Sequence, residues 1–226
     1  MTIYSRRAFL AGTATVAASL ALSGCANSRR LSKRRAALIA PTKEAPSSTF
    51  ALAYGARPNE PYPIPAIDPK RLPRKYRRAL VDDPTGEKPG TVIVDTSNRY
   101  LYHVLPGGKA KRYGVGIGRA GFAWSGRAII AYKRRWPTWT PPEEMIERQP
   151  ELAKFRNGME PGLKNPLGAR ALYIHQDGKD TLYRLHGTNE VGSIGKAVSS
   201  GCVRLLHQDV IHLFDNVRNG SPILVR

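Results

Sequence analysis

Short runs of β-branched, aromatic and aliphatic residues alternate with turn residues along the C-terminal part of the chain. Residues 91–95 and 100–104 form the first two runs, and a turn at 106–108 precedes a third run at 110–117. Runs of this kind, broken at hairpin spacing, predict an antiparallel meander. The same pattern predicts further strands at residues 128–132, 171–175, 183–186 and 223–225.

A long segment, residues 137–168, is rich in proline and glycine and shows no strand pattern. Within it, Thr140 and Glu143 have the spacing of a capping box, which predicts a short helix that runs to about Gln149 and is interrupted by Pro150. A loop of this length in a compact domain is usually functional. We therefore expect the segment to form a lid or wall over a cleft, and a surface decoration is the alternative.

A second helical pattern covers residues 208–217. Val210, Leu213 and Phe214 fall on one face of this helix, and Gly220 ends it. Strands therefore dominate the predicted fold, which is mainly β with one or two short helices.

The composition changes near residue 89. Residues 89–226 are rich in Leu, Val and Ile and are numerous enough to bury the core of one domain. Residues 26–88 contain basic pairs and many prolines, which predicts a flexible tether that buries little surface. Within this tether, residues 76–81 are expected to form a short turn or strand against the domain.

Residues 1–25 resemble a bacterial export signal. Arg6 and Arg7 precede an apolar stretch that ends at Leu22 and is too short to span a bilayer comfortably. The residues around the arginine pair are typical of the twin-arginine route, and the general secretory route is the alternative. Cys25 follows Leu-Ser-Gly, as in a lipobox, so we expect an acylated Cys25 and a periplasmic protein anchored by lipid to the outer membrane.

The chain is strongly basic, with 36 Lys and Arg against 17 Asp and Glu and a net charge of +19. In a cytoplasmic protein this charge would favour nucleic acid as a partner. No nucleic-acid module accompanies it, and the leader indicates export, so we expect no nucleic-acid partner. Outside the cytoplasm a basic surface favours anionic wall polymer and lipid head groups. A basic surface that serves solubility alone is the remaining alternative.

The candidate chemistry lies at His186 and Cys202. A thiol and an imidazole are the groups that nucleophilic acyl transfer needs, and Gly187 and Gly201 beside them let the backbone approach a ligand closely. A neighbouring imidazole lowers the pKa of a cysteine from about 8.5, and the resulting ion pair supplies the attacking thiolate. The alternative is a core cysteine and a structural histidine. The other cysteine and histidines have no zinc-site spacing, so we expect no metal, no cofactor and no disulfide.

The order of motifs resembles the signature of the L,D-transpeptidase (YkuD-type) catalytic domain. The resemblance rests on His186-Gly187-Thr188 and on Ser199-Ser200-Gly201-Cys202-Val203-Arg204, supported by segments 137–142 and 165–168. Ser200 stands where many members carry a second histidine, a departure that leaves the thiol and imidazole untouched. The resemblance extends from about residue 89 to the C-terminus and implies a β-sandwich of mixed sheets with one or two short helices.

By this resemblance, Cys202 attacks a stem peptide of peptidoglycan and expels its terminal D-alanine. His186 takes the thiol proton, and the carbonyl of Gly187 orients the imidazole. Backbone N–H groups at Gly201 and Cys202, with Ser199 nearby, face the developing oxyanion.

Three questions stay open at the level of sequence. Arg204 either holds a substrate carboxylate or braces the loop through an internal ion pair. Trp139 and Tyr173 are candidates to line the cleft. The acyl group passes to an amine of a second stem peptide, to the N-terminus of an outer-membrane protein, or to water in a hydrolase; a wall-binding lipoprotein without catalysis is the last alternative.

Overall fold

The computed structural model describes residues 47–119, 124–199 and 201–226. The chain divides into two compact units, residues 1–44 and 45–226, and every described residue belongs to the second unit. The expected export signal, the lipobox at Cys25 and the first part of the expected tether lie outside the described residues, as does Ser200. Within the described part of the chain, no helix is long and apolar enough to cross a bilayer.

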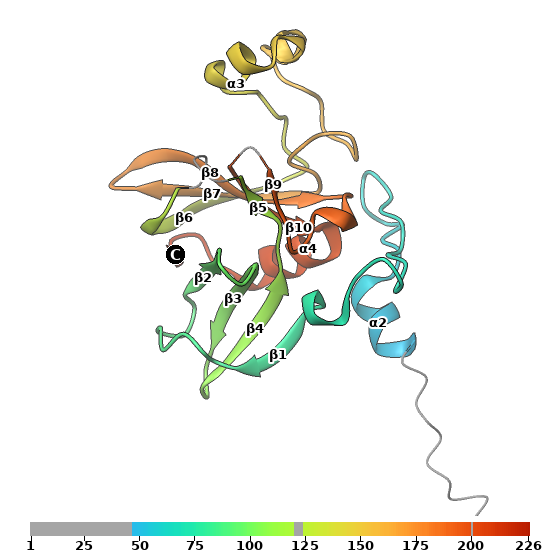
Figure 1. Cartoon of the computed structure of the whole chain (residues 1–226), viewed down its shortest axis with the longest axis vertical. Coiled ribbons are helices and arrows are strands. Elements are labelled where there is room, and N and C mark those ends of the chain that lie inside the picture. The colour runs from blue at the N-terminus through green and yellow to red at the C-terminus, as the bar shows by residue number, and fades with distance from the viewer. Residues whose placement is uncertain (1–46, 120–123, 200) are drawn as a thin grey trace, which may run out of the picture. The chain divides into compact units, whose positions relative to one another are not determined.

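Nine strands of the described residues form one mixed sheet in the order β1-β4-β3-β2-β11-β6-β7-β8-β10 (Figure 1). In chain order these strands are β1 (Ala79–Asp82), β2 (Val92–Asp95), β3 (Tyr100–Leu105), β4 (Lys109–Gly114), β6 (Gly126–Arg135), β7 (Arg170–Gln176), β8 (Lys179–Thr188), β10 (Val203–Leu206) and β11 (Pro222–Val225). Strands β5 (Ile117–Gly118) and β9 (Ala197–Ser199) form a separate parallel pair.

The helices are short. Within the described residues they are α2 (Ser47–Tyr54), α3 (Glu143–Arg148) and α4 (His207–Asn216), with 3-10 turns η1 (Arg74–Tyr76), η2 (Pro150–Phe155) and η3 (Val191–Ser193). The prediction of a mainly β fold with mixed sheets and short helices is confirmed. So is the meander, because β3 pairs antiparallel with both β2 and β4.

The core lies between the sheet and α4. Val210 and Leu213 of α4 are fully buried and pack with residues of β7 and β8, among them Leu172 and Leu185. The apolar face that the sequence predicts for this helix is therefore buried, and the structure shows that α4 packs on β8, the strand that carries His186.

Two local predictions are wrong. The predicted capping box does not form, because the N-cap residue of α3 is Pro142 and no side chain caps the helix. Thr140 follows Trp139, whose backbone pairs with Met159, so the chain is still extended there. The predicted strand 110–117 ends early, and its last residue belongs to β5, because the chain leaves the meander after β4.

The prediction of a flexible tether is wrong for residues 47–88. Tyr54 and Leu72 are 2% and 0% exposed and pack in one apolar cluster with Val191, Ile194 and Leu206 of the domain. Strand β1 adds to the edge of the sheet beside β4, near the position predicted for a short strand. The prolines keep this segment extended, but the apolar residues between them find partners far away in the sequence.

Candidate active site

Parallel pairing of β8 and β10 brings the two candidate residues together. His186 lies on β8, and Cys202 directly precedes β10, whose Arg204 stands opposite His186 in the register. His186 is buried, with 6% exposure. Cys202, His186 and Arg204 line the same cavity, of about 240 Å³. The thiol and the imidazole, which are distant in the sequence, therefore open onto a common space.

The imidazole of His186 is oriented by the backbone. Its Nδ1 lies 3.0 Å from the carbonyl oxygen of Gly187. A carbonyl only accepts hydrogen bonds, so Nδ1 carries the proton and Nε2 is left as the basic nitrogen. Burial lowers the pKa of His186 to about 4, despite opposing effects of the Gly187 and Pro166 carbonyls, and nearby Arg204 lowers it further. The imidazole is therefore neutral at neutral pH.

A buried group of side chains supports the backbone at Gly187. A Cβ atom on Gly187 would lie 2.5 Å from Nδ1 of His207, so the His207 ring packs directly on this backbone. The ring of Trp136 lies 6.2 Å from that of His207 between centroids. Glu60 accepts hydrogen bonds from Arg170 at 2.6 and 3.0 Å and from the indole of Trp136 at 2.8 Å. Glu60 belongs to the segment that was expected to be a flexible tether. This segment therefore contributes to the group of side chains that supports the imidazole of His186.

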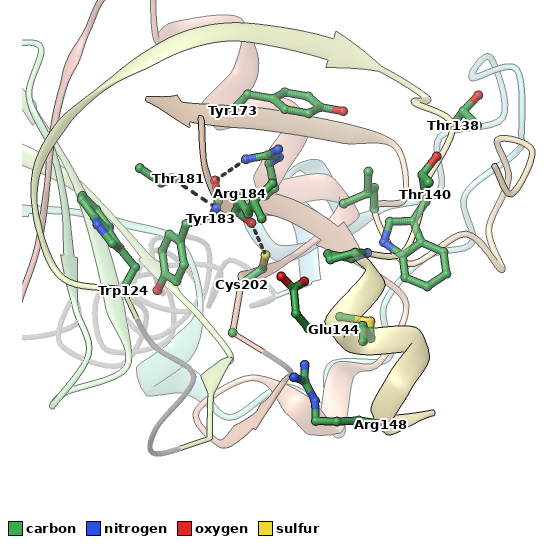
Figure 2. Close-up of a pocket in the computed structure, with 16 residues that line it drawn as sticks. Trp124, Thr138, Thr140, Glu144, Arg148, Tyr173, Thr181, Tyr183, Arg184 and Cys202 are labelled. Carbon is green, nitrogen blue, oxygen red and sulfur yellow. Dashed lines mark hydrogen bonds between the residues drawn. The ribbon is translucent and has the colours of Figure 1, made fainter. Parts of the chain in front are cut away.

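The thiol of Cys202 is in a setting that favours its neutral form. Its Sγ lies 3.7 Å from the carbonyl oxygen of Leu182, which Figure 2 shows as a dashed line (Figure 2). Burial raises the pKa of Cys202, although Arg184 and Arg204 oppose this effect. Burial therefore opposes the thiolate–imidazolium pair that the sequence motif predicts. Burial disfavours both charged forms, and burial is a property that the sequence motif does not contain.

A larger cavity, of about 530 Å³, adjoins the cavity of about 240 Å³, and Cys202, Trp139, Met145 and Leu167 line both. Trp139 and Tyr173 line the larger cavity, as the sequence analysis suggested, together with Thr138, Glu144 and other residues of the segment 137–168. This segment therefore forms a wall of the cavity, which favours a functional role over a surface decoration.

Asn165 holds the two ends of this wall together. Its buried side-chain amide donates to the carbonyl oxygens of Pro137, Met159 and Glu160 at 3.1, 3.0 and 3.1 Å. Its side-chain oxygen accepts a hydrogen bond from the backbone N–H of Leu167 at 2.9 Å. The two N–H groups of this amide are shared among the three carbonyl oxygens, and its oxygen accepts the fourth contact, so one side chain ties four backbone groups together at the base of the wall.

Arg204 forms an ion pair with Glu190, with Nη1 2.5 Å from Oε2. The Arg204 side chain is 24% exposed and that of Glu190 is 67% exposed. The backbone of Arg204 also exchanges two hydrogen bonds with Gly116, at 2.8 and 2.9 Å. The internal ion pair, one of the two alternatives for Arg204, is therefore present in the structure. Arg204 also lines the smaller cavity.

The loop before Cys202 is tightly packed against β5. Gly201 has φ +139°, a region that L side chains rarely adopt. A Cβ atom on Gly118 would lie 2.7 Å from the Cα of Gly201. Ser199 pairs with Gly118 in the small sheet, so its backbone is fixed beside the same loop.

Several site residues were missed by the sequence analysis. Glu60, Arg170 and His207 support the imidazole, and Glu144 and Arg148 line the larger cavity. Among the described residues, no group of three or more His, Cys, Asp or Glu is placed to hold a metal ion.

The mixed sheet thus brings a thiol and a backbone-oriented imidazole to one cavity, which are the two groups that nucleophilic acyl transfer by a cysteine needs. The model of the L,D-transpeptidase catalytic domain (YkuD) matches residues 89–225. The chain belongs to this family.

Named relatives agree with this assignment. The probable L,D-transpeptidase ErfK/SrfK of Escherichia coli K12 is 33% identical over 141 residues, which cover 59% of this chain and 43% of the relative. Its Salmonella typhimurium counterpart is 30% identical over 188 residues, covering 80% and 59%. The chain thus spans about half the length of the curated relatives it matches.

Among solved structures, one from Brucella melitensis described as a probable carnitine operon oxidoreductase CaiA is 44% identical. The match covers 68% of this chain and 96% of that chain, with a TM-score of 0.48.

Proposed function

We propose that the protein is a peptidoglycan L,D-transpeptidase with Cys202 as nucleophile and His186 as general base. The observation that carries this proposal is the shared cavity of Cys202 and His186, with Nδ1 of the imidazole fixed 3.0 Å from the Gly187 carbonyl. That contact leaves Nε2 as the nitrogen that can take the thiol proton. Family membership supports the stem peptide as the substrate class.

In the first step, Sγ of Cys202 forms a bond to the carbonyl carbon of the third stem residue, and its proton passes to Nε2 of His186. The bond to the terminal D-alanine then breaks, and His186 returns the proton to the leaving amine. Because both groups are neutral before the attack, charge develops only as the bond forms. The site thereby avoids holding a buried ion pair between turnovers.

In the second step, an acceptor amine attacks the thioester. The new C–N bond forms, the C–S bond breaks, and His186 carries a proton from the attacking amine to sulfur. The product is a cross-linked stem or, with a protein N-terminus as acceptor, an attached outer-membrane protein. The smaller cavity, which His186 and Cys202 both line, is the proposed approach of the acceptor amine to the thioester.

The backbone N–H groups of Gly201 and Cys202, with Ser199 nearby, are the proposed oxyanion donors. Close packing of Gly201 on β5 supports this role, because a donor that is already fixed loses no entropy during the reaction. For Arg204 we propose the bracing role, since its guanidinium is engaged by Glu190.

We also propose, from residues 1–25, that the protein is anchored by lipid to the outer membrane. Cys25 after Leu-Ser-Gly supports acylation, and the absence of aspartate after it supports the periplasmic face of the outer membrane. Replacing Cys25 by Ser should release the protein into the soluble periplasmic fraction or stall its processing. A wild-type protein that is fully soluble and carries no acyl mass at its N-terminus would refute the anchor and leave the active site untouched.

Mass spectrometry of tetrapeptide muropeptides incubated with the protein tests the activity. Cross-linked dimers are expected, with loss of one D-alanine for each cross-link. Shortened tripeptides alone would identify a hydrolase, and unchanged tetrapeptides would refute catalysis.

A further inference from the structure

Helix α3 presents two side chains of opposite charge to the larger cavity. Glu144 and Arg148 are four residues apart, so they lie on the same face of the helix. Both line the cavity together with Cys202, and Figure 2 shows Glu144 extending from α3 toward the thiol with Arg148 on the same helix. The neighbouring Glu143 instead pairs with Arg156 at 2.7 Å and does not line this cavity.

The carboxylate of Glu144 is available to a ligand. Among the described residues it takes part in no hydrogen bond or ion pair. The nearby Arg184 also lines the cavity, but Asp180 accepts hydrogen bonds from both its Nη atoms at 2.6 Å. Arg148 has five N–H donors, so it can receive a carboxylate in addition to its contacts within the protein.

The position of His186 indicates which part of the substrate binds in the larger cavity. The imidazole gives its proton to the leaving amine, so the leaving D-alanine lies on the side of the smaller cavity, which His186 lines. By microscopic reversibility the acceptor amine approaches from the same side. The larger cavity, which His186 does not line, is then left for the acyl part of the donor.

The family resemblance implies that the third stem residue, whose carbonyl Cys202 attacks, is a diamino acid, usually diaminopimelate. We propose that Glu144 and Arg148 bind the free end of its side chain. Glu144 receives the ammonium group and Arg148 receives the carboxylate. A diaminopimelate side chain ends in both groups on one carbon, whereas a lysine side chain ends in the ammonium group alone. The pair therefore selects diaminopimelate donors over lysine donors. This inference rests on the proposed function and assigns specificity within it.

Release of D-alanine in a single turnover tests the pair without any acceptor. The donors are tetrapeptides whose third residue is meso-diaminopimelate, the same residue with its side-chain carboxylate amidated, or lysine. Wild type should favour the first donor. Glu144→Gln should lower kcat/KM on all three donors by about tenfold, the size expected of a hydrogen bond to a charged group. Arg148→Gln should lower it by about tenfold on the first donor alone, so that the three donors become nearly equal.

Glu147→Gln is the matched control, because Glu147 is an exposed carboxylate of the same helix that lines neither cavity. It should behave as wild type, and thermal midpoints of all variants should show that they are folded. If Arg148→Gln keeps the preference for diaminopimelate, or if only cross-linking falls and D-alanine release does not, the assignment is wrong. If wild type releases no D-alanine from any donor, the proposed function fails together with it.

Discussion

The two sides of Cys202 are built in different ways. On the side of His186, the supporting groups are buried and paired: the side chain of Arg170 is 3% exposed and its partner Glu60 is 17% exposed. On the side of α3, the charged groups Glu144 and Arg148 are exposed. In the proposed reaction, the buried residues hold His186 in position. The exposed residues Glu144 and Arg148 contact the side chain of the donor.

The buried side also shows why residues outside the family domain matter. Glu60 lies before residue 89, where the family match begins. Burial opposes its ionisation, but hydrogen bonds from Arg170 and Trp136 outweigh that effect and lower the pKa of Glu60. The segment 47–88 is therefore part of the structure that supports the site.

The largest effect on the chemistry should come from the imidazole. His186→Gln should lower the acylation rate by roughly 10²–10⁴-fold, because general-base help of this kind is lost. Single-turnover release of D-alanine measures it, and binding of a tetrapeptide to the variant should change little. A rate within a few-fold of wild type would mean that the buried side does not supply the base.

Breaking the buried support should cost stability. Glu60→Gln leaves Arg170 as an uncompensated buried charge, which typically costs about 3–5 kcal/mol. The pKa of Glu60 is lowered in the folded protein, so its contribution is present above about pH 4.5 and fades as the pH falls below that value. Urea unfolding at pH 7 and pH 4 should therefore show a smaller difference between variant and wild type at pH 4.

Glu143→Gln is the control for that experiment. Its partner Arg156 is 57% exposed, and solvent screens an exposed ion pair, so the loss of stability should be much smaller than for Glu60→Gln. If Glu60→Gln and Glu143→Gln lowered the free energy of unfolding equally, the buried pair would be no more important for stability than the exposed pair.

The pH dependence of the site should reflect two neutral groups. Burial lowers the pKa of His186 to about 4, so acylation should fall only as the pH drops through about 4. Burial raises the pKa of Cys202, so alkylation by iodoacetamide should rise only above the ordinary thiol range of about pH 8.5. Rapid alkylation that persists to pH 5 would instead indicate a standing thiolate.

The smallest effect concerns the brace at Arg204. Glu190→Gln should change the free energy of unfolding by less than about 1 kcal/mol, because Glu190 is 67% exposed. Acylation should also stay close to wild type if Arg204 only braces the loop. A clear rise in activity would show that Glu190 had been competing with a substrate carboxylate for Arg204.

Local patterns account for what the sequence could predict. The strands of the meander and α4 could be predicted because their hydrophobic repeat is visible in consecutive residues. The motifs around His186 and Cys202 contain the thiol, the imidazole and Gly187. Such patterns do not show which distant segments pair, so β10 was missed, although its pairing with β8 places Arg204 opposite His186 and brings the preceding Cys202 near it.

The errors have the same origin. Tyr54 and Leu72 looked like parts of a tether because their partners, such as Leu206, lie far along the chain. The burial that raises the pKa of Cys202 also depends on the whole fold, so the local motif does not contain it. Glu60 gave no signal at all, since its hydrogen bonds to Arg170 and Trp136 span distant segments of the sequence.

Intact-protein mass spectrometry shows whether Cys202 forms the acyl-enzyme. The protein is incubated with a tetrapeptide donor or with a carbapenem, and the modified peptide is mapped after digestion. We predict an added acyl mass on the peptide that contains Cys202 and none in Cys202→Ala, whose small side chain should leave the fold intact. An adduct that persists in Cys202→Ala, or one mapped to another residue in wild type, would show that Cys202 is not the nucleophile.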